Sequence, residues 1–275
     1  MADIRIGISG WTFPPWRGEF YPEGLAQKRE LGYASRKLNS IELNGSFYSL
    51  QSPASYRKWF DETPEDFVFA IKGGQFITHI RRLREVRIPI ANFFASGVLG
   101  LNQKLGPLFW QLPPNFQFDQ ALFDEFLALL PHSTKAAAKL AGEHQIKVAK
   151  KVSIEVDCDR PLRHAIEVRH KSFDNADFIK LARKHDVGIV IADTQQWPAF
   201  SEVTSDFVYA RLHGELEMYP KGYTDAAIDT WAKQIKKWNK SFDVYAYFDS
   251  EMKVRSPLDA MSLAERLGLS AKEFA

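Results

Sequence analysis

Cysteine is nearly missing from this sequence, since Cys158 is the only one among 275 residues. A single cysteine excludes a disulfide within the chain and fits a reducing compartment. No apolar run approaches the roughly 20 residues that a membrane-spanning helix needs. The start, from Met1 to Arg5, also lacks the basic and then apolar pattern of a secretory signal. We therefore expect a soluble, cytoplasmic protein without membrane contact.

A large excess of positive charge is also absent. The chain has 36 Lys and Arg against 34 Asp and Glu, so the formal charge is 36 − 34 = +2. Nucleic-acid-binding proteins concentrate positive charge to displace counterions. Nucleic-acid binding through residues 81–87 and the lysines of 133–161 therefore ranks last among the partners considered. The glycine-rich motifs that bind nucleotide phosphates are absent too.

What the sequence does have is a regular alternation of two kinds of segment. Eight short runs rich in β-branched or aromatic residues are typical of strands: 4–10, 40–46, 67–73, 108–112, 165–169, 188–193, 207–213 and 244–249. Seven longer periodic stretches predict helices: 24–38, 53–62, 89–105, 120–130, 176–184, 224–239 and 258–267. This alternation predicts parallel strands joined by helical crossovers.

Eight such strands fit a closed α/β barrel of the (β/α)8 TIM type better than an open sheet. We expect residues 1–275 to form a single barrel domain. Residues 133–161 interrupt the alternation before the fifth strand, and their Ala136-Ala137-Ala138 core with scattered Lys and Glu predicts a solvated helical insertion.

Polar side chains recur at the carboxyl ends of the predicted strands, and their alternate neighbours are mostly apolar. They are Glu42, Asn44, Lys72, Gln111, Glu167, Arg169, Asp193, Arg211, His213, Tyr247 and Asp249. Side chains two apart on a strand share a face, and barrel enzymes draw their sites from these ends. We expect the polar groups to meet at the C-terminal mouth. An alternative stays open, in which Glu42 or Glu167 pairs with Arg169 or Arg211 in an internal salt-bridge layer that only plugs the barrel.

These residue types suggest roles for the mouth. The candidate catalytic residues are Glu42, Lys72, Glu167 and His213, since paired carboxylates and a histidine suit general acid/base chemistry. The candidate substrate-binding residues are Trp11, Asn44, Tyr48, His79, Gln111, Arg169, Asp193, Arg211 and Asp249. Arginine and lysine suit phosphate or carboxylate, and flat aromatic walls suit a sugar.

Metal and cofactor use stays open. No His-x-x-x-His or Cys-x-x-Cys spacing occurs, so a preformed zinc site is only weakly indicated, and no cofactor is required by the sequence. A divalent metal held by Glu42, Glu167, Asp193 and His213 is a variant of the hypothesis.

Motifs along nearly the whole chain resemble the YecE-like proteins, the family of domain of unknown function 72. The matching segments are Gly7-Ile8-Ser9-Gly10-Trp11, Trp16-Arg17-Gly18, Phe20-Tyr21-Pro22, Glu42-Leu43-Asn44, Phe47-Tyr48, Phe69-Ala70-Ile71-Lys72, Ile77-Thr78-His79, Leu105-Gly106-Pro107, Gln111-Leu112-Pro113-Pro114, Glu167-Val168-Arg169-His170 and Arg211-Leu212-His213-Gly214. The resemblance implies a TIM-type barrel and no settled activity. The last strand departs from the family pattern, with Asp249-Ser250-Glu251 in place of a run such as Asn-Asn-Asp.

Our leading functional hypothesis is an enzyme, such as a hydrolase or an isomerase, that acts on a small polar anionic ligand by general acid/base chemistry. Two enzyme alternatives are a metal-assisted phosphoester hydrolase and a glycosidase, which needs two carboxyl groups about 5 to 5.5 Å or 6.5 to 9.5 Å apart. A noncatalytic ligand-sensing barrel is the alternative from another class. The oligomeric state stays open.

Overall fold

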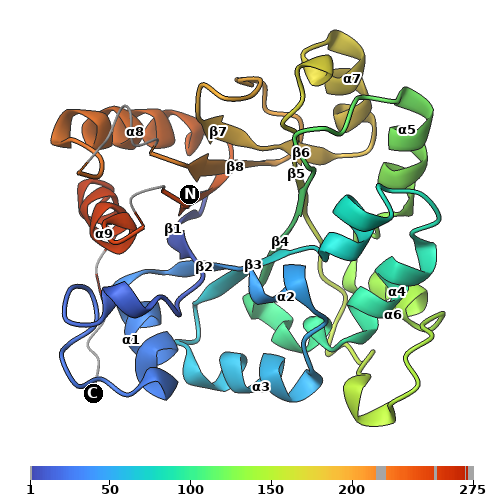
Figure 1. Cartoon of the computed structure of the whole chain (residues 1–275), viewed down its shortest axis with the longest axis horizontal. Coiled ribbons are helices and arrows are strands. Elements are labelled where there is room, and N and C mark those ends of the chain that lie inside the picture. The colour runs from blue at the N-terminus through green and yellow to red at the C-terminus, as the bar shows by residue number, and fades with distance from the viewer. Residues whose placement is uncertain (1, 215–220, 251–252, 270, 272–275) are drawn as a thin grey trace.

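A ring of parallel strands forms the centre of the molecule, which was studied as a computed structural model describing residues 2–214, 221–250, 253–269 and 271. Within these residues the strands are β1 (Ile4–Ser9), β2 (Ser40–Leu43), β3 (Val68–Lys72), β4 (Leu105–Gln111), β5 (His164–Glu167), β6 (Val187–Ile189), β7 (Ile191–Asp193), β8 (Phe207–Leu212) and β9 (Asp243–Phe248). Their order in the sheet is β6-β5-β4-β3-β2-β1-β9-β8-β7, and every pair is parallel (Figure 1).

The two ends of this order are halves of one extended segment. β6 pairs with β5, β7 pairs with β8, and Val190 alone separates the two halves. The Val190 amide still donates to the Ile166 carbonyl at 2.9 Å, so the segment changes partner without leaving the ring. The ring therefore closes as in a TIM-type barrel, and the sixth predicted strand corresponds to β6 and β7 together.

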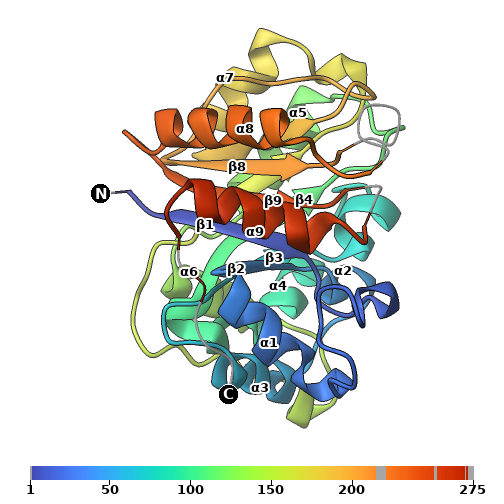
Figure 2. The same ribbon diagram turned by 90° about the vertical axis from the view of Figure 1, so that its left-hand side faces the viewer.

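Helices surround the ring on its outside (Figures 1 and 2). They are α1 (Glu30–Lys37), α2 (Gly45–Tyr48), α3 (Pro53–Glu62), α4 (Arg87–Ala95), α5 (Gln120–Leu129), α6 (Thr134–Ala141), α7 (Ala176–Lys184), α8 (Asp225–Trp238) and α9 (Ser256–Arg266). Shorter turns are η1 (Pro14–Trp16), η2 (Gln27–Arg29), η3 (Phe76–Ile80), η4 (Val98–Lys104), η5 (Ala149–Lys151) and η6 (Lys171–Phe173). None of the helices in the described part of the chain combines the length and the apolar character needed to cross a membrane.

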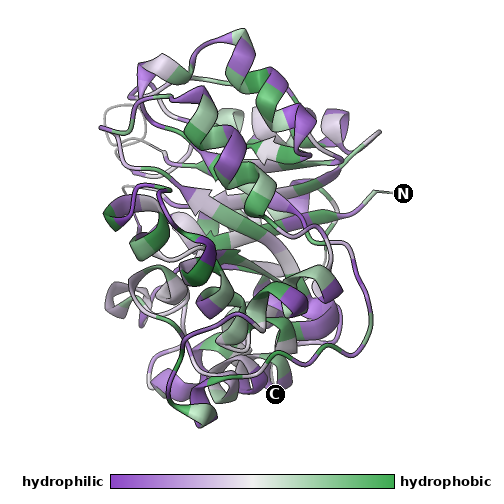
Figure 3. Cartoon of the chain, turned by 90° about the vertical axis from the view of Figure 1, so that its right-hand side faces the viewer, coloured by the Kyte–Doolittle hydropathy of each residue, from purple (hydrophilic) through white to green (hydrophobic). Residues whose placement is uncertain are grey.

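The strands bury two separate apolar surfaces because successive side chains point to opposite faces. The outer face, which includes Ile6, Ile8 and Ile41, packs against the helices. Along those helices hydrophilic and hydrophobic positions alternate (Figure 3). The inner face forms its own cluster, made of Ala70, Phe109, Ala165, Val190, Phe207, Tyr209, Tyr245 and Tyr247.

The inner aromatic rings fill the barrel below its mouth. Tyr209 stacks on Phe109 with ring centroids 5.3 Å apart and lies 5.2 Å from the Tyr247 ring. Gly7 makes room for this packing, because a Cβ there would lie 2.2 Å from the Ser40 carbonyl oxygen. The mouth therefore has a buried aromatic floor, on which charged groups interact more strongly than in water.

Three predicted segments are shorter than expected. The strand predicted at 40–46 stops at Leu43, because Asn44 has helical backbone angles and begins the single turn α2. The helix predicted at 89–105 breaks at Gly97, whose φ of 99° ends α4 and leads into η4, so β4 begins at Leu105. The helix predicted at 24–38 is regular only over α1, with η2 before it.

The insertion predicted at 133–161 contains one α-helix that is less solvated than expected. In α6, Ala137, Leu140 and Ala141 are buried, and the helix packs against α4. Ser133 caps it by accepting a hydrogen bond from the Ala136 amide at 3.2 Å. The alanines thus allow close helix packing, and the rest of the insertion is irregular apart from η5.

Candidate active site at the barrel mouth

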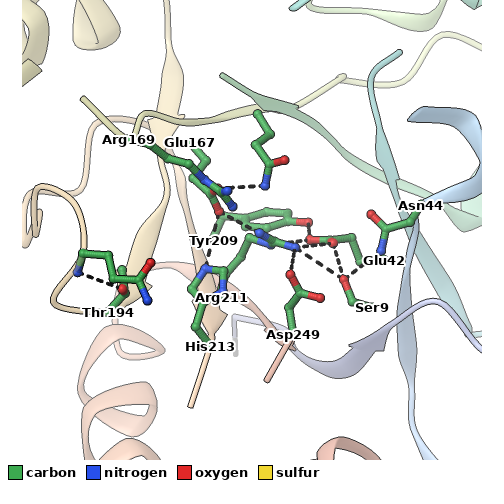
Figure 4. Close-up of polar contacts among 12 residues, drawn as sticks. Ser9, Glu42, Asn44, Glu167, Arg169, Thr194, Tyr209, Arg211, His213 and Asp249 are labelled. Carbon is green, nitrogen blue, oxygen red and sulfur yellow. Dashed lines mark hydrogen bonds and ion pairs between the residues drawn. The ribbon is translucent and has the colours of Figure 1, made fainter. Parts of the chain in front are cut away.

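Arg211 of β8 lies at the centre of the mouth and binds three carboxylates (Figure 4). It donates to both carboxylate oxygens of Glu42 at 3.0 Å, to Glu167 Oε2 at 2.8 Å and to Asp249 Oδ2 at 2.6 Å. Burial alone would lower the pKa of Arg211, but the three carboxylates outweigh it and hold that pKa well above its ordinary value. Arg211 therefore stays positively charged at every physiological pH.

Glu42 of β2 is fully buried and fully hydrogen-bonded. Besides the two bonds from Arg211, it accepts a hydrogen bond from Ser9 Oγ at 2.6 Å and one from the Tyr209 hydroxyl at 2.7 Å. Asn44 Nδ2 in turn donates to Ser9 Oγ at 2.8 Å. Glu42 therefore cannot accept a substrate proton without losing one of these partners.

Glu167 of β5 is held in the same way. Its Oε1 accepts from Gln111 Nε2 at 2.9 Å and from Arg169 Nε at 2.6 Å, while His213 Nε2 lies 3.7 Å from Oε2. Burial would raise the pKa of Glu167, but the charge of Arg211 dominates and holds that pKa well below its usual range. Together the two glutamates and Arg211 form the internal salt-bridge layer that the sequence left open.

A cavity of about 440 Å³ lies beside this layer. Its lining residues within the described chain are Ser9, Gly10, Trp11, Thr12, Leu43, Asn44, Gly45, Tyr48, Gln51, Trp59, Lys72, Arg211, Asp249 and Lys253. The Asp249 side chain is 23% exposed, in contrast to the sealed glutamates. Burial would raise the pKa of Asp249, but Arg211 outweighs it and lowers that pKa. The mouth therefore contains both a sealed ionic layer and room for a small molecule.

Lys72 ends β3 at the edge of this cavity, and its side chain is surrounded by aromatic rings. Its Nζ lies 4.4 Å from the ring centroid of Phe47 and 5.6 Å from that of Phe109. Among the described residues it makes no hydrogen bond or ion pair, although Lys72 is only 8% exposed. Burial, assisted by the charge of Arg211, lowers the pKa of Lys72 to about 8.

Two opposing free energies act on the Lys72 ammonium: attraction to the aromatic rings and the cost of its removal from water. A cation over an aromatic face gains about 0.5 to 2 kcal/mol, whereas removing an ammonium from water costs several kcal/mol. The ring contacts therefore offset part of the free-energy cost of removing the ammonium from water, but not all of it. Lys72 therefore gives up its proton more readily than an ordinary lysine.

Other predicted site residues lie around the cavity or apart from it. Arg169 stacks over Trp197 at 4.3 Å. His79 bonds to Thr78 through Nδ1 at 2.9 Å, and burial, followed by the charge of Lys72, lowers the His79 pKa.

Asp193 is not among the cavity-lining residues, because it accepts a hydrogen bond from the Tyr223 hydroxyl at 2.6 Å. Glu251, predicted to follow the last strand, lies outside the described residues. The described residues also contain no group of three or more His, Cys, Asp or Glu side chains arranged to hold a metal ion, so the structure gives no support to the metal variant of the hypothesis. The carboxylates of Glu42 and Glu167 are occupied by Arg211 instead.

The sequence reasoning missed four residues of the mouth. Tyr209 shares the period of two with Arg211 and could have been found from it. Ser9 ends β1 and belongs to the Gly7–Trp11 motif, but it was given no role in the site. Trp59 and Lys253 line the cavity from α3 and from the segment after β9, and no strand-end signal marks them.

Comparison with known proteins gives consistent matches. A sequence profile described as "Protein of unknown function DUF72" matches residues 5–275. Two relatives are the UPF0759 protein YunF of Bacillus subtilis, 35% identical over 79 residues, and the UPF0759 protein YecE of Escherichia coli, 30% identical over 113 residues. These alignments cover 29% and 41% of this chain, and only 27% of YunF and 39% of YecE.

Solved structures match over almost the whole chain. A DUF72 family protein of Thermotoga maritima has a TM-score of 0.72 at 21% identity, covering 97% of this chain and 99% of that one. A DUF72 family protein of Enterococcus faecalis has a TM-score of 0.70 at 16% identity, covering 99% and 98%. At these identities the matches establish the barrel fold and nothing about substrates.

Proposed function

Because the chain belongs to the DUF72 family, whose description names no activity, we propose its function from the barrel mouth: an enzyme that binds a small polar anion and transfers protons through Lys72. The observation that carries this proposal is the Lys72 amine, buried at the edge of an accessible cavity and without an ionic partner among the described residues. General acid/base groups work best when their pKa lies near the operating pH. A pKa of about 8 meets that condition.

The charge of the cavity lining supports an anionic ligand. Lys72, Arg211 and Lys253 are basic and Asp249 is acidic, so the described lining carries 3 − 1 = +2. The sealed glutamates Glu42 and Glu167 carry −2 and balance this charge in total, but they lie behind Arg211 and present no free carboxylate to the cavity. A phosphate or carboxylate group at the Lys72 and Lys253 side would therefore gain two cations at little electrostatic cost.

The proposal changes the roles expected for the two glutamates. Glu42 and Glu167 position the Arg211 guanidinium. Asp249 binds Arg211 through Oδ2, and its Oδ1, which has no hydrogen-bond donor within the described part of the chain, is available to contact a ligand. This arrangement counts against a glycosidase, which needs two carboxyl groups facing the same sugar. A sealed pair would have to break its bonds to Arg211 first.

A binding screen followed by product analysis tests the proposal. Small phosphorylated and carboxylated metabolites are screened by thermal shift against the wild type, the Lys72→Met variant and a Lys180→Met control, whose side chain is 75% exposed on α7. We expect anionic metabolites to stabilise the wild type and the control more than Lys72→Met. Each hit is then incubated with protein and followed by mass spectrometry.

The outcomes separate the classes of function. Turnover in the wild type and the control, with a loss of about 10² or more in Lys72→Met, supports the enzyme. A ligand that stabilises the protein but stays intact would favour the noncatalytic sensing barrel. Anions that stabilise Lys72→Met as well as the wild type would remove Lys72 from the site.

A further inference from the structure

A second buried lysine shows what an ordinary buried ammonium requires. Lys104 is 3% exposed, and its Nζ donates to the Phe60 carbonyl at 2.5 Å, the Thr63 carbonyl at 2.8 Å and Thr63 Oγ1 at 3.1 Å. These acceptors replace the water that the ammonium lost. Lys72 is almost as buried but has no such acceptors within the described residues, and it lines the cavity. Its surroundings therefore suit a neutral amine with a free lone pair.

We propose that Lys72 is a nucleophile that forms an imine with the aldehyde or ketone group of an anionic, hydroxyl-bearing substrate. The inference rests on the proposed function, since it uses the same anion-binding cavity and the same low-pKa amine. It names the substrate class and gives Lys72 a covalent role in addition to proton transfer. Lysines become nucleophilic when they are desolvated or lie beside another cation. Lys72 meets both conditions, because Arg211 stays charged next to it.

Two features of the cavity lining define the rest of the substrate. Lys253 lines the same cavity as Lys72 and can hold a phosphate or carboxylate while Lys72 reacts. Asn44 Oδ1 is buried and accepts no hydrogen bond within the described residues, although Asn44 Nδ2 is bound to Ser9. A buried acceptor without a donor is rare in folded proteins. A substrate hydroxyl that donates to Asn44 Oδ1 would satisfy it.

The covalent step balances without any further reagent. The Lys72 Nζ lone pair forms a bond to the carbonyl carbon, and the carbonyl π pair moves to oxygen, which takes a proton to give a carbinolamine. Nitrogen then loses a proton, which is passed to the carbinolamine hydroxyl, so that the C–O bond breaks and the oxygen leaves as water. The product is the protonated imine, and one proton from solvent is consumed overall. Asp249 Oδ1 has no hydrogen-bond donor among the described residues and is the group placed to relay these protons.

The charged neighbours of Lys72 predict the pH dependence of this reaction. They come from four elements and from the segment after β9: Glu42 of β2, His79 of η3, Glu167 of β5, Arg211 of β8, and Asp249. Burial and Arg211 lower the pKa of Lys72 to about 8, against the opposing carboxylates. At pH 7.5 about a quarter of the Lys72 amines are then neutral, compared with about one in a thousand for an ordinary lysine, a gain of about 200-fold.

Reductive trapping tests the inference. The full chain is incubated at pH 7.5 with glyceraldehyde 3-phosphate and cyanoborohydride, and modified lysines are located by peptide mass spectrometry. Glyceraldehyde is the uncharged match, and the exposed Lys180 of the same chain is the internal reference. We expect Lys72 to be modified at least ten-fold faster than Lys180, with a preference for the phosphorylated probe that Lys180 lacks.

A binding measurement separates failure of this inference from failure of the proposed function. Calorimetry with glyceraldehyde 3-phosphate, without reductant, is carried out on the wild type and on Lys72→Arg, which keeps the charge but cannot form an imine. Binding to both proteins with no preferential trapping at Lys72 would overturn the imine and leave the anion site standing. Neither binding nor trapping would overturn both.

Discussion

Arg211 is the residue whose removal should damage the fold most, and the size of the effect follows from its partners. In Arg211→Met, the buried Glu42 loses two hydrogen bonds at 3.0 Å and Glu167 loses one at 2.8 Å. Leaving a buried charge without its partner costs about 3 to 5 kcal/mol. The total free energy of unfolding of a protein domain is about 5 to 15 kcal/mol. The variant should therefore lose a large share of its free energy of unfolding.

Urea unfolding at pH 7.5, followed by tryptophan fluorescence and circular dichroism, measures this loss. Arg87→Met is the matched control, because Arg87 also binds a carboxylate through two nitrogens, at Glu143, but its side chain is 56% exposed. An exposed pair contributes about 0 to 1 kcal/mol. Adding Glu42→Gln to Arg211→Met removes the uncompensated charge and should recover about 1 kcal/mol or more. The reasoning is refuted if Arg211→Met loses no more stability than the Arg87→Met control.

Three further predictions concern single residues. Lys72→Met should raise the free energy of unfolding at pH 7 by about 1 to 3 kcal/mol, because the native pKa of Lys72 lies near 8 instead of 10.5. Between pH 8 and pH 10.5 the unfolded wild type binds more protons than the folded one, so wild-type stability should rise with pH there. Urea titrations at pH 7 and pH 9.5 should therefore show a smaller stability difference between Lys72→Met and the wild type at the higher pH. Burial lowers the pKa of His164 to about 3, so its ring resonances in NMR should stay those of a neutral imidazole down to pH 4.5, and a titration near 6.5 would contradict this. Gly7→Ala should cost about 1 to 3 kcal/mol or more, since the new Cβ meets the Ser40 carbonyl oxygen at 2.2 Å. Gly100→Ala, with open space around its Cβ, should cost under 1 kcal/mol, and urea titration of both variants measures the difference.

The burial of Lys72 without an ion pair among the described residues bears on its function. A site that keeps an ammonium out of water without a partner lowers the stability of the fold. Glu42 and Glu167 could have supplied that partner, yet they are bound to Arg211. The proposed chemistry explains this arrangement, because an ion pair at Lys72 would hold its proton and remove its reactivity.

The barrel could be read from the sequence because its cause is local. Apolar runs with β-branched residues, each followed by an amphipathic stretch, define parallel strands and their crossover helices without knowledge of any long-range contact. The alternation of faces also placed Glu42, Lys72, Glu167 and Arg211 on one side of their strands, where the structure has them. Asp193 was assigned to that side from its position at the end of its strand and from its apolar neighbour Ala192.

The position of Asp193 away from the cavity lining has a simple reason. Residues 187–192 are all apolar or glycine, so a period of two gives no signal for which face points inward. In the barrel Val190 belongs to the inner cluster, which turns Asp193 outward to Tyr223. The break of the 89–105 helix at Gly97 likewise depended on a distant contact, since a Cβ there would lie 2.7 Å from Pro53 Cα.

By itself the sequence determined the ring of strands and the gathering of ionisable groups at its mouth, because both follow from periodicity along single segments. Only the tertiary structure decided how those groups are paired. One guanidinium reaches the carboxylates of three other strand ends, while the Lys72 amine is turned between two aromatic rings toward a cavity. Which carboxylate pairs with which cation depends on the distances between side chains from different strands. No pattern along one strand records those distances.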